Sequence, residues 1–191
     1  GDIEVWQGVF TSVTFLECVC KLDRLDGLLN NAGTNRVGPM VEQVPDSIDL
    51  IIGLYIRAVY RVTQAAITPM KRAGGGSIVS ITSQMGHVGS PGRTLYCMSK
   101  HAIEGLSKAL AVELAEEGIR VNTVPPTFVL TPMTRPMFEN EEFYDFVMSM
   151  IPMKKLAEAE DIANACTYLF SDLSASTTGA SLRVDGGWTA Q

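Results

Sequence analysis

Three residues have types and spacing that suit the chemistry of carbonyl and alcohol groups: Ser83, Tyr96 and Lys100. Tyr96 and Lys100 are four residues apart in a segment with helical spacing, so both side chains lie on one face. A carbonyl that accepts hydride needs a proton, and a tyrosine whose pKa of about 10 is lowered by a nearby ammonium can supply it. A serine hydroxyl can hold the substrate oxygen. The alternative interpretation is a serine in a turn beside a half-buried tyrosine.

The segments that must position these side chains alternate between strands and helices. We expect strands at Ile3–Gln7, Leu25–Asn30, Ser77–Thr82, Ile119–Val124 and Ser181–Asp185. We expect helices at Asp46–Ala73, Thr94–Glu117 and Asp161–Phe170, with a short one bearing Val13, Leu16, Val19 and Cys20. Pro69 should kink the first long helix, and Leu130–Ile151 reads as irregular or helical. This alternation predicts an α/β fold with a mostly parallel sheet, and Ser83 then follows a strand where such sheets open their ligand crevice.

Composition indicates one domain with a sizeable core, because 46% of the 191 residues are hydrophobic and 19% are charged. The net charge of −6 and the lack of a basic cluster argue against nucleic acid and membrane partners. The apolar runs are also shorter than the roughly 18 residues of a membrane span. The cysteines and histidines show no metal-ligand spacing, which favours reduced thiols in a cytoplasmic protein without a metal: Cys18, Cys20, Cys97, Cys166, His87 and His101.

The chain resembles the short-chain dehydrogenase/reductase family in a series of segments that occur in the family's order and spacing. These are Asn30–Gly33, Ser77–Ser83, Tyr96–Lys100, Gly118–Asn122 and Val184–Gly187. The resemblance implies a single Rossmann-type domain, 1–191, with a doubly wound, mostly parallel sheet and NAD or NADP as cofactor. It also implies that Ser83, Tyr96 and Lys100 are catalytic. The cofactor contacts that it implies are Asn31, Ala32, Gly33, Tyr96, Lys100, Pro126, Val129 and Thr131.

Three departures from the family pattern affect these expectations. The glycine-rich turn that holds the cofactor pyrophosphate, Thr-Gly-x-x-x-Gly-x-Gly, is absent from the sequence. We therefore expect a domain that lacks its first two strands and does not, by itself, hold a nicotinamide dinucleotide productively. Thr127 replaces a glycine, and Tyr55 stands where the family carries an asparagine. Tyr55 either takes part in a proton relay or packs as an apolar-face residue of the helix.

The function that follows is NAD(P)-dependent interconversion of a secondary alcohol and a ketone. Sugars, sugar acids, polyols and 3-oxoacyl compounds are the substrates that the resemblance suggests, and it implies a homodimer or homotetramer paired through the two long helices. Gln84, His87 and Arg93 could face a polar substrate, and Met133–Ile151 either closes over it or packs as core. The alternative is a non-catalytic binding or assembly module, favoured by the missing turn and Tyr55.

Overall fold

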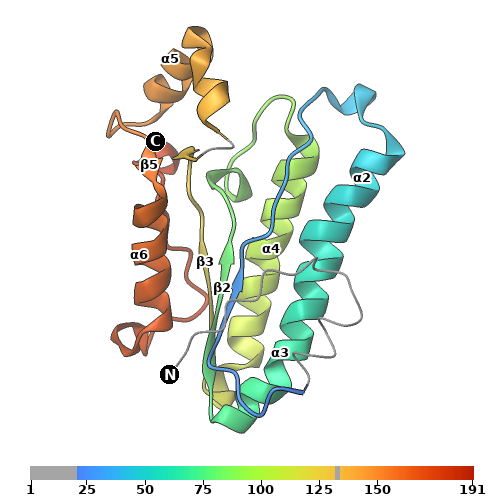
Figure 1. Cartoon of the computed structure of the whole chain (residues 1–191), viewed down its shortest axis with the longest axis vertical. Helices are drawn as coiled ribbons and strands as arrows, with labels where there is room; N and C mark the ends of the chain where they lie inside the picture. Colours follow the sequence, from blue (N-terminus) through green and yellow to red (C-terminus); the bar gives the residue numbers. More distant parts are fainter. Residues whose placement is uncertain (1–20, 132–133) are drawn as a thin grey trace.

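The computed structural model of the chain describes residues 21–131 and 134–191 (Figure 1). The strand expected at Ile3–Gln7 and the short helix expected after it lie outside the described residues, so both stay predictions.

The described sheet contains parallel strands in the order β1 (Gly27–Asn30), β2 (Gly76–Ile81) and β3 (Ile119–Val124). Their register places Asn30 beside Ser80 and Ile81 beside Val124, so the carboxyl ends of the strands meet at one edge. The predicted last strand is present only as parallel bridges from Ser181 to Thr123 and from Val184 to Pro126. A second, two-stranded sheet pairs β4 (Val129–Leu130) with β5 (Ala157–Glu158). The mostly parallel α/β fold is thereby confirmed.

Helices cover both faces of this sheet (Figure 1). One face carries α3 (Val59–Ala73) and α4 (Thr94–Glu113), and the other carries α6 (Ala159–Phe170). The short helix α5 (Glu141–Met150) lies beyond the edge at which the strands end. The 3-10 turns are η1 (Met40–Glu42), η3 (Gln84–Gly86), η4 (Ala115–Glu117), η5 (Arg135–Glu139), η6 (Asp172–Ser174) and η7 (Trp188–Ala190).

The first long helix is a composite of α2 (Pro45–Ile51), the π-helical segment η2 (Ile52–Ala58) and α3. Its departure from α-helical hydrogen bonding therefore lies earlier than the predicted kink at Pro69. The helix continues through Pro69 and ends at Gly74, whose φ of 87° is left-handed and favours glycine.

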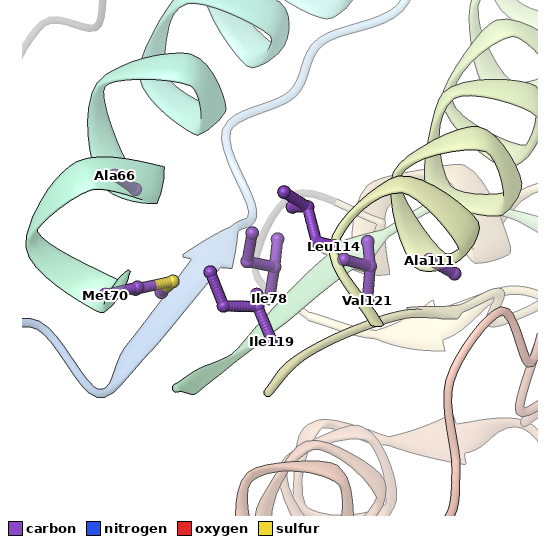
Figure 2. Close-up of a cluster of buried hydrophobic side chains, with 7 residues drawn as sticks. All are labelled: Ala66, Met70, Ile78, Ala111, Leu114, Ile119 and Val121. Atoms are coloured by element: carbon purple, nitrogen blue, oxygen red, sulfur yellow. The ribbon is translucent and has the colours of Figure 1, made fainter. Parts of the chain in front are cut away.

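The core fills the space between the sheet and its helices. On one side, Ile78 of β2 and Val121 of β3 point at α3 and α4 (Figure 2). On the other, Val79 and Val124 pack against Leu169 of α6. Because successive strand residues alternate between faces, both sides of β2 are buried, as parallel strands require. The cluster in Figure 2 consists of Ala66, Met70, Ile78, Ala111, Leu114, Ile119 and Val121.

The helical stretch Pro45–Ala73 is long and apolar enough, by length and composition, to cross a membrane, with a mean hydropathy of 1.3. This differs from the expectation from uninterrupted apolar runs, all of which are too short to span a membrane. Ile51, Val62 and Met70 of this stretch are fully or almost fully buried inside the domain. We therefore interpret it as a core helix of the α/β fold.

Candidate active site

The three candidate catalytic residues lie at the carboxyl edge of the sheet. Ser83 follows β2 and caps η3, where its Oγ accepts the N–H of Met85 at 3.2 Å. Tyr96 and Lys100 come from the first two turns of α4, one turn apart on the same face. The Lys100 Nζ lies 5.4 Å from the centroid of the Tyr96 ring. The strand end and the helix thus bring a hydroxyl, a phenol and an amine to one place.

Lys100 is buried, with only 4% of its surface exposed. Its Nζ donates to the carbonyl oxygen of Ile81 at 3.0 Å and lies 4.3 Å from the centroid of the Tyr55 ring. Burial lowers the pKa of Lys100 to about 7, while the nearby Glu104 acts in the opposite direction. The side chain therefore changes charge near neutral pH.

The sequence led us to expect that the lysine lowers the pKa of Tyr96, but the shift in the structure has the opposite direction. Burial raises the pKa of Tyr96, although the nearby Ser83 hydroxyl and the Arg93 guanidinium both oppose this shift. The physical reason is that burial disfavours both charged forms, the phenolate of Tyr96 and the ammonium of Lys100. Lys100 therefore holds its proton less tightly. The phenol is consequently held in its neutral form, with a proton to donate.

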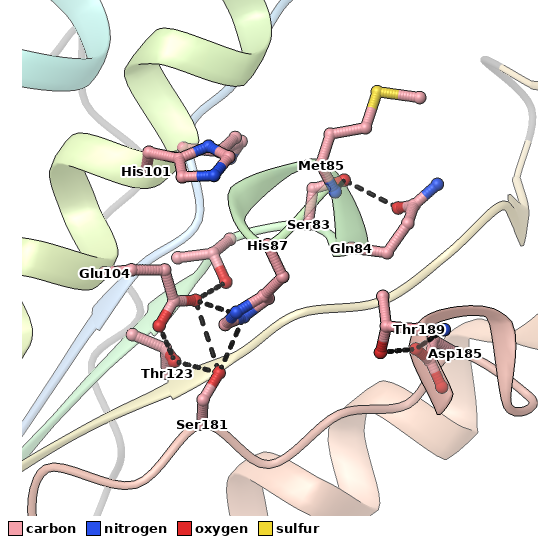
Figure 3. A network of polar contacts seen from close by, with 12 residues as sticks. Ser83, Gln84, Met85, His87, His101, Glu104, Thr123, Ser181, Asp185 and Thr189 are labelled. Atoms are coloured by element: carbon pink, nitrogen blue, oxygen red, sulfur yellow. Dashed lines mark hydrogen bonds and ion pairs between the residues drawn. The ribbon is translucent and has the colours of Figure 1, made fainter. Parts of the chain in front are cut away.

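Side chains of the loop after Ser83 form hydrogen bonds with other groups of the protein. The Ser83 Oγ donates to the Gln84 Oε1 at 2.7 Å, and Gln84 is only 2% exposed. The His87 Nε2 lies 3.0 Å from the Ser181 Oγ, within a polar network behind the turn (Figure 3). These contacts bind both side chains to protein groups, and a contact of either side chain with a substrate stays a prediction. Arg93 is half-buried and acts electrostatically on Tyr96.

A groove of about 500 Å³ lies between the ends of the strands and α6, and its lining includes Ile81 but not Ser83, Tyr96 or Lys100. Four of the residues expected to bind the cofactor line it, namely Asn31, Pro126, Val129 and Thr131. The side chains of Ile162, Cys166 and Phe170 give its α6 wall an apolar surface. Ala32 instead lines a separate small hollow next to Leu54 and Ala58.

Tyr55 contributes a contact that the sequence did not reveal. Its Oη donates to the Thr34 carbonyl oxygen at 2.6 Å and accepts the Thr34 N–H at 2.7 Å. The residue is 3% exposed, and its ring meets that of Tyr96 edge to face at a centroid distance of 6.0 Å. The packing interpretation is therefore favoured over the proton relay, since the hydroxyl proton is already bound to backbone. A Cβ atom on Gly33 would lie 2.6 Å from this Oη, so the position requires glycine.

The described residues fit the nicotinamide side of a dinucleotide better than its pyrophosphate. The groove offers an apolar wall from α6, and outside its lining the Thr127 Oγ1 is buried without a partner among the described groups. Residues 21–131 and 134–191 contain no turn of the pattern Thr-Gly-x-x-x-Gly-x-Gly that could hold a pyrophosphate. Over the same ranges, Cys97 and Cys166 are free, and no three His, Cys, Asp or Glu side chains gather as metal ligands.

Comparison with known proteins decides the family. Residues 10–189 match the family model described as Enoyl-(Acyl carrier protein) reductase. A D-beta-hydroxybutyrate dehydrogenase of Rhizobium meliloti is 36% identical over 182 residues, which covers 88% of this chain and 70% of the relative. The chain belongs to the short-chain dehydrogenase/reductase family. As a short-chain dehydrogenase/reductase, it is an NAD(P)-dependent oxidoreductase that acts on a CH–OH group.

Other short-chain dehydrogenase/reductases share both sequence and fold with the chain. The 3-oxoacyl-(acyl-carrier-protein) reductase FabG of Thermotoga maritima is 37% identical over 169 residues, covering 88% of this chain and 68% of the relative. The solved gluconate 5-dehydrogenase of Burkholderia cenocepacia, in complex with NADP and tartrate, has a TM-score of 0.87 at 27% identity. That match covers 92% of this chain and 69% of the solved one. The Rossmann-type fold is thus confirmed.

The depressed pKa of Lys100 predicts how stability changes with pH. Because this pKa is about 7 in the folded chain and about 10.4 in an unfolded one, the unfolded state binds more protons between these values. The free energy of unfolding should therefore rise as the pH increases from 7 toward 10. Urea denaturation across this range measures it. Lys100→Met should remove most of the rise, and a parent chain without any rise would contradict the shift.

Proposed function

We propose that the chain interconverts a secondary alcohol and a ketone, with Ser83, Tyr96 and Lys100 as its catalytic residues. The observation that carries this proposal is the meeting of Tyr96 and Lys100, from one face of α4, with Ser83 at the end of β2. A groove lined by Ile81, whose carbonyl oxygen accepts from the Lys100 Nζ, opens at the carboxyl edge of the sheet, the usual ligand position in such folds.

Each side chain has a role that its surroundings support. When bound, NAD(P)H supplies the hydride for carbonyl reduction, and NAD(P)+ accepts it in the reverse direction. The neutral Tyr96 hydroxyl donates its proton to the carbonyl oxygen. The Ser83 hydroxyl binds the same oxygen after exchanging its bond to Gln84. When protonated, Lys100 would favour the phenolate that remains on Tyr96, in opposition to the burial that raises the pKa of Tyr96.

The cofactor would be held by two sets of residues. Asn31, Ala32 and Gly33 follow β1 and would run beside the adenosine half, while Tyr55 fixes the next residue, Thr34. Pro126, Val129 and Thr131 would adjoin the nicotinamide, and Tyr96 and Lys100 its ribose. The Thr131 Oγ1 lies 3.1 Å from the Thr134 Oγ1, so a phosphate or carboxamide would compete with that contact.

The names of the relatives indicate which class of substrate the chain acts on. Relatives named for hydroxybutyrate, 3-oxoacyl and gluconate substrates support a sugar, sugar acid, polyol or 3-oxoacyl compound.

An aromatic cluster connects α5 with Phe128 and with the C-terminal Trp188. The centroid of the Phe128 ring lies 5.5 Å from that of Phe143 and 5.9 Å from that of Trp188. This packing favours the core role for much of the described part of the 133–151 segment, residues 134–151, while Phe146 is 54% exposed.

The proposed activity is tested by binding and turnover measured together. NADH and NADPH are titrated by fluorescence, and reduction of 3-oxoacyl and keto-sugar-acid substrates is followed at millimolar nucleotide. We expect slow turnover with weak nucleotide binding, because this sequence has no turn of the pyrophosphate-binding pattern Thr-Gly-x-x-x-Gly-x-Gly. The protein as encoded, including any residues upstream of Gly1, is assayed in parallel. Nucleotide binding without turnover in both forms would favour the non-catalytic binding or assembly module.

We also propose that the chain forms a homodimer or homotetramer through its long helices. Apolar side chains remain exposed on these helices, including Tyr60 at 54%, Met98 at 48% and Val112 at 83%. Burying them against the same surface of a second copy would form a self-complementary interface. Light scattering at micromolar concentration should show a dimer or tetramer, and a monomer would contradict this.

The composition further supports a cytoplasmic protein without nucleic acid or membrane partners.

A further inference from the structure

A buried carboxylate lies directly behind the proposed catalytic residues. Glu104 is 5% exposed and follows Lys100 by one turn of α4. Its Oε1 accepts from the Thr82 Oγ1 at 2.6 Å and lies 3.3 Å from the His87 Nε2. Its Oε2 accepts from the Thr123 Oγ1 at 3.0 Å. The proposed reaction gives this group no role, although burying a carboxylate is costly unless it is well paired.

The partners of Glu104 come from separate elements that surround the site (Figure 3). Thr82 directly precedes Ser83, and His87 ends the turn that Ser83 begins. Thr123 belongs to β3, and Ser181, at 3.4 Å from Oε1, belongs to the C-terminal segment. A single side chain of α4 therefore accepts a hydrogen bond from Thr82 at one end of the Ser83 turn and lies next to His87 at the other end.

The backbone of this turn also lies close to α4. A Cβ on Gly86 would lie 3.2 Å from the Lys100 carbonyl oxygen and 3.2 Å from the Glu104 Cγ. The turn is closed by N–H bonds from Gly86 to the Ser83 carbonyl at 2.8 Å and from His87 to the Gln84 carbonyl at 2.9 Å. Movement of the turn away from α4 would separate Ser83 from Tyr96 and Lys100.

We propose that Glu104 is a positioning residue, whose carboxylate fixes the Ser83 turn on helix α4 and so sets the distance of Ser83 from Tyr96 and Lys100. This inference rests on the proposed oxidoreductase function and extends it to a residue that does not touch the reactants. Glu104 also places a negative charge near Lys100, whose ammonium otherwise faces the rings of Tyr55 and Tyr96.

The experiment compares Glu104→Gln with Glu104→Asp and with a matched control, Ser77→Ala. Glutamine keeps the shape but replaces an acceptor oxygen with a donor NH₂, opposite groups that already donate. Aspartate keeps the charge and shortens the reach. Ser77 is buried at the opposite end of β2, where its Oγ donates to the Leu169 carbonyl oxygen at 2.8 Å. The control therefore loses a buried hydrogen bond of the same strand, far from the turn.

We expect Glu104→Gln to lower kcat by about 10- to 100-fold with a nearly unchanged KM, because small displacements of catalytic groups have effects of this size. Without the nearby charge, Lys100 should lose its proton more readily, so the pH limb of kcat that it controls should move to lower pH. Glu104→Asp should keep the limb in place, and Ser77→Ala should change neither quantity. A merely structural role would lower stability without moving the limb.

Hydrogen exchange of the Met85, Gly86 and His87 amides provides a readout that does not depend on turnover. Glu104→Gln should accelerate their exchange, whereas Ser77→Ala should not. An active parent whose Glu104→Gln variant keeps its kcat, pH limb and exchange would overturn this inference and leave the proposed function intact. If the parent has no activity, the proposed function fails, and unchanged exchange in Glu104→Gln would then overturn the positioning role as well.

Discussion

Replacing Tyr96 with phenylalanine should lower turnover by about 10²- to 10⁴-fold, the usual loss when a general acid is removed. The variant lacks only the hydroxyl that is to donate the proton, and the ring that contacts Tyr55 and Lys100 stays in place. Folding and nucleotide binding should therefore change little. Steady-state kinetics give the loss of turnover, and fluorescence titration with NADPH gives the binding.

The matched control for this variant is Tyr60→Phe on α3. Tyr60 is 54% exposed, and the same hydroxyl removal there should leave turnover unchanged. Near-normal turnover in Tyr96→Phe would remove Tyr96 from the reaction and, with it, the role assigned to Lys100. Equal losses in both variants would indicate a general effect on folding rather than a lost proton donor.

Replacing Tyr55 with alanine should lower the free energy of unfolding by about 3–5 kcal/mol, as for other large aromatic side chains removed from a core. The ring is 3% exposed and packs in a cluster with Ile51, Leu95 and Ile103. It also lies beneath the Lys100 amine, so its removal opens a cavity next to the proposed site. Urea denaturation measures the change, and a loss below 1 kcal/mol would contradict the packing role.

Tyr55→Phe separates the ring from the hydroxyl. The Thr34 N–H and carbonyl oxygen lose their side-chain partner, at a cost of about 1–3 kcal/mol if they stay buried. The Gly33→Ala substitution provides a check, because its Cβ would clash with the Tyr55 Oη. Gly33→Ala should be less harmful in the Tyr55→Phe background than in the parent chain. Purely additive effects would show that the hydroxyl does not restrict this position.

Much of the fold follows from local sequence patterns. The β-branched run Ser77–Thr82 predicts β2, and Gly74 and Gly118 mark helix ends through their left-handed backbone. The spacing of Tyr96 and Lys100 predicts their common face because an α-helix fixes it locally. The predicted last strand, Ser181–Asp185, is present only as isolated bridges, and Pro125 and Pro126 opposite it have no N–H to donate.

The parts of the site that sequence could not predict depend on contacts between distant segments. The Tyr55 hydroxyl forms hydrogen bonds with the backbone N–H and carbonyl of Thr34. A pattern of side-chain types does not show which backbone groups are available for such bonds. Glu104 looks like an ordinary polar residue of a helix until β2, β3 and the C-terminal segment surround it. The pKa of Tyr96 was misjudged because it depends on burial as well as on the neighbouring charge.

The π-helical segment Ile52–Ala58 has a consequence for how this helix tolerates insertions and deletions. Its i to i+5 hydrogen bonds accommodate one residue more than an α-helix of the same rise. Loss of a single residue here, such as Gly53, would restore α-helical bonding and leave the helices on either side facing the core as before. Tyr55 would then leave its place beneath Lys100. Homologues with a gap of one residue in this segment should therefore carry a different side chain next to the lysine.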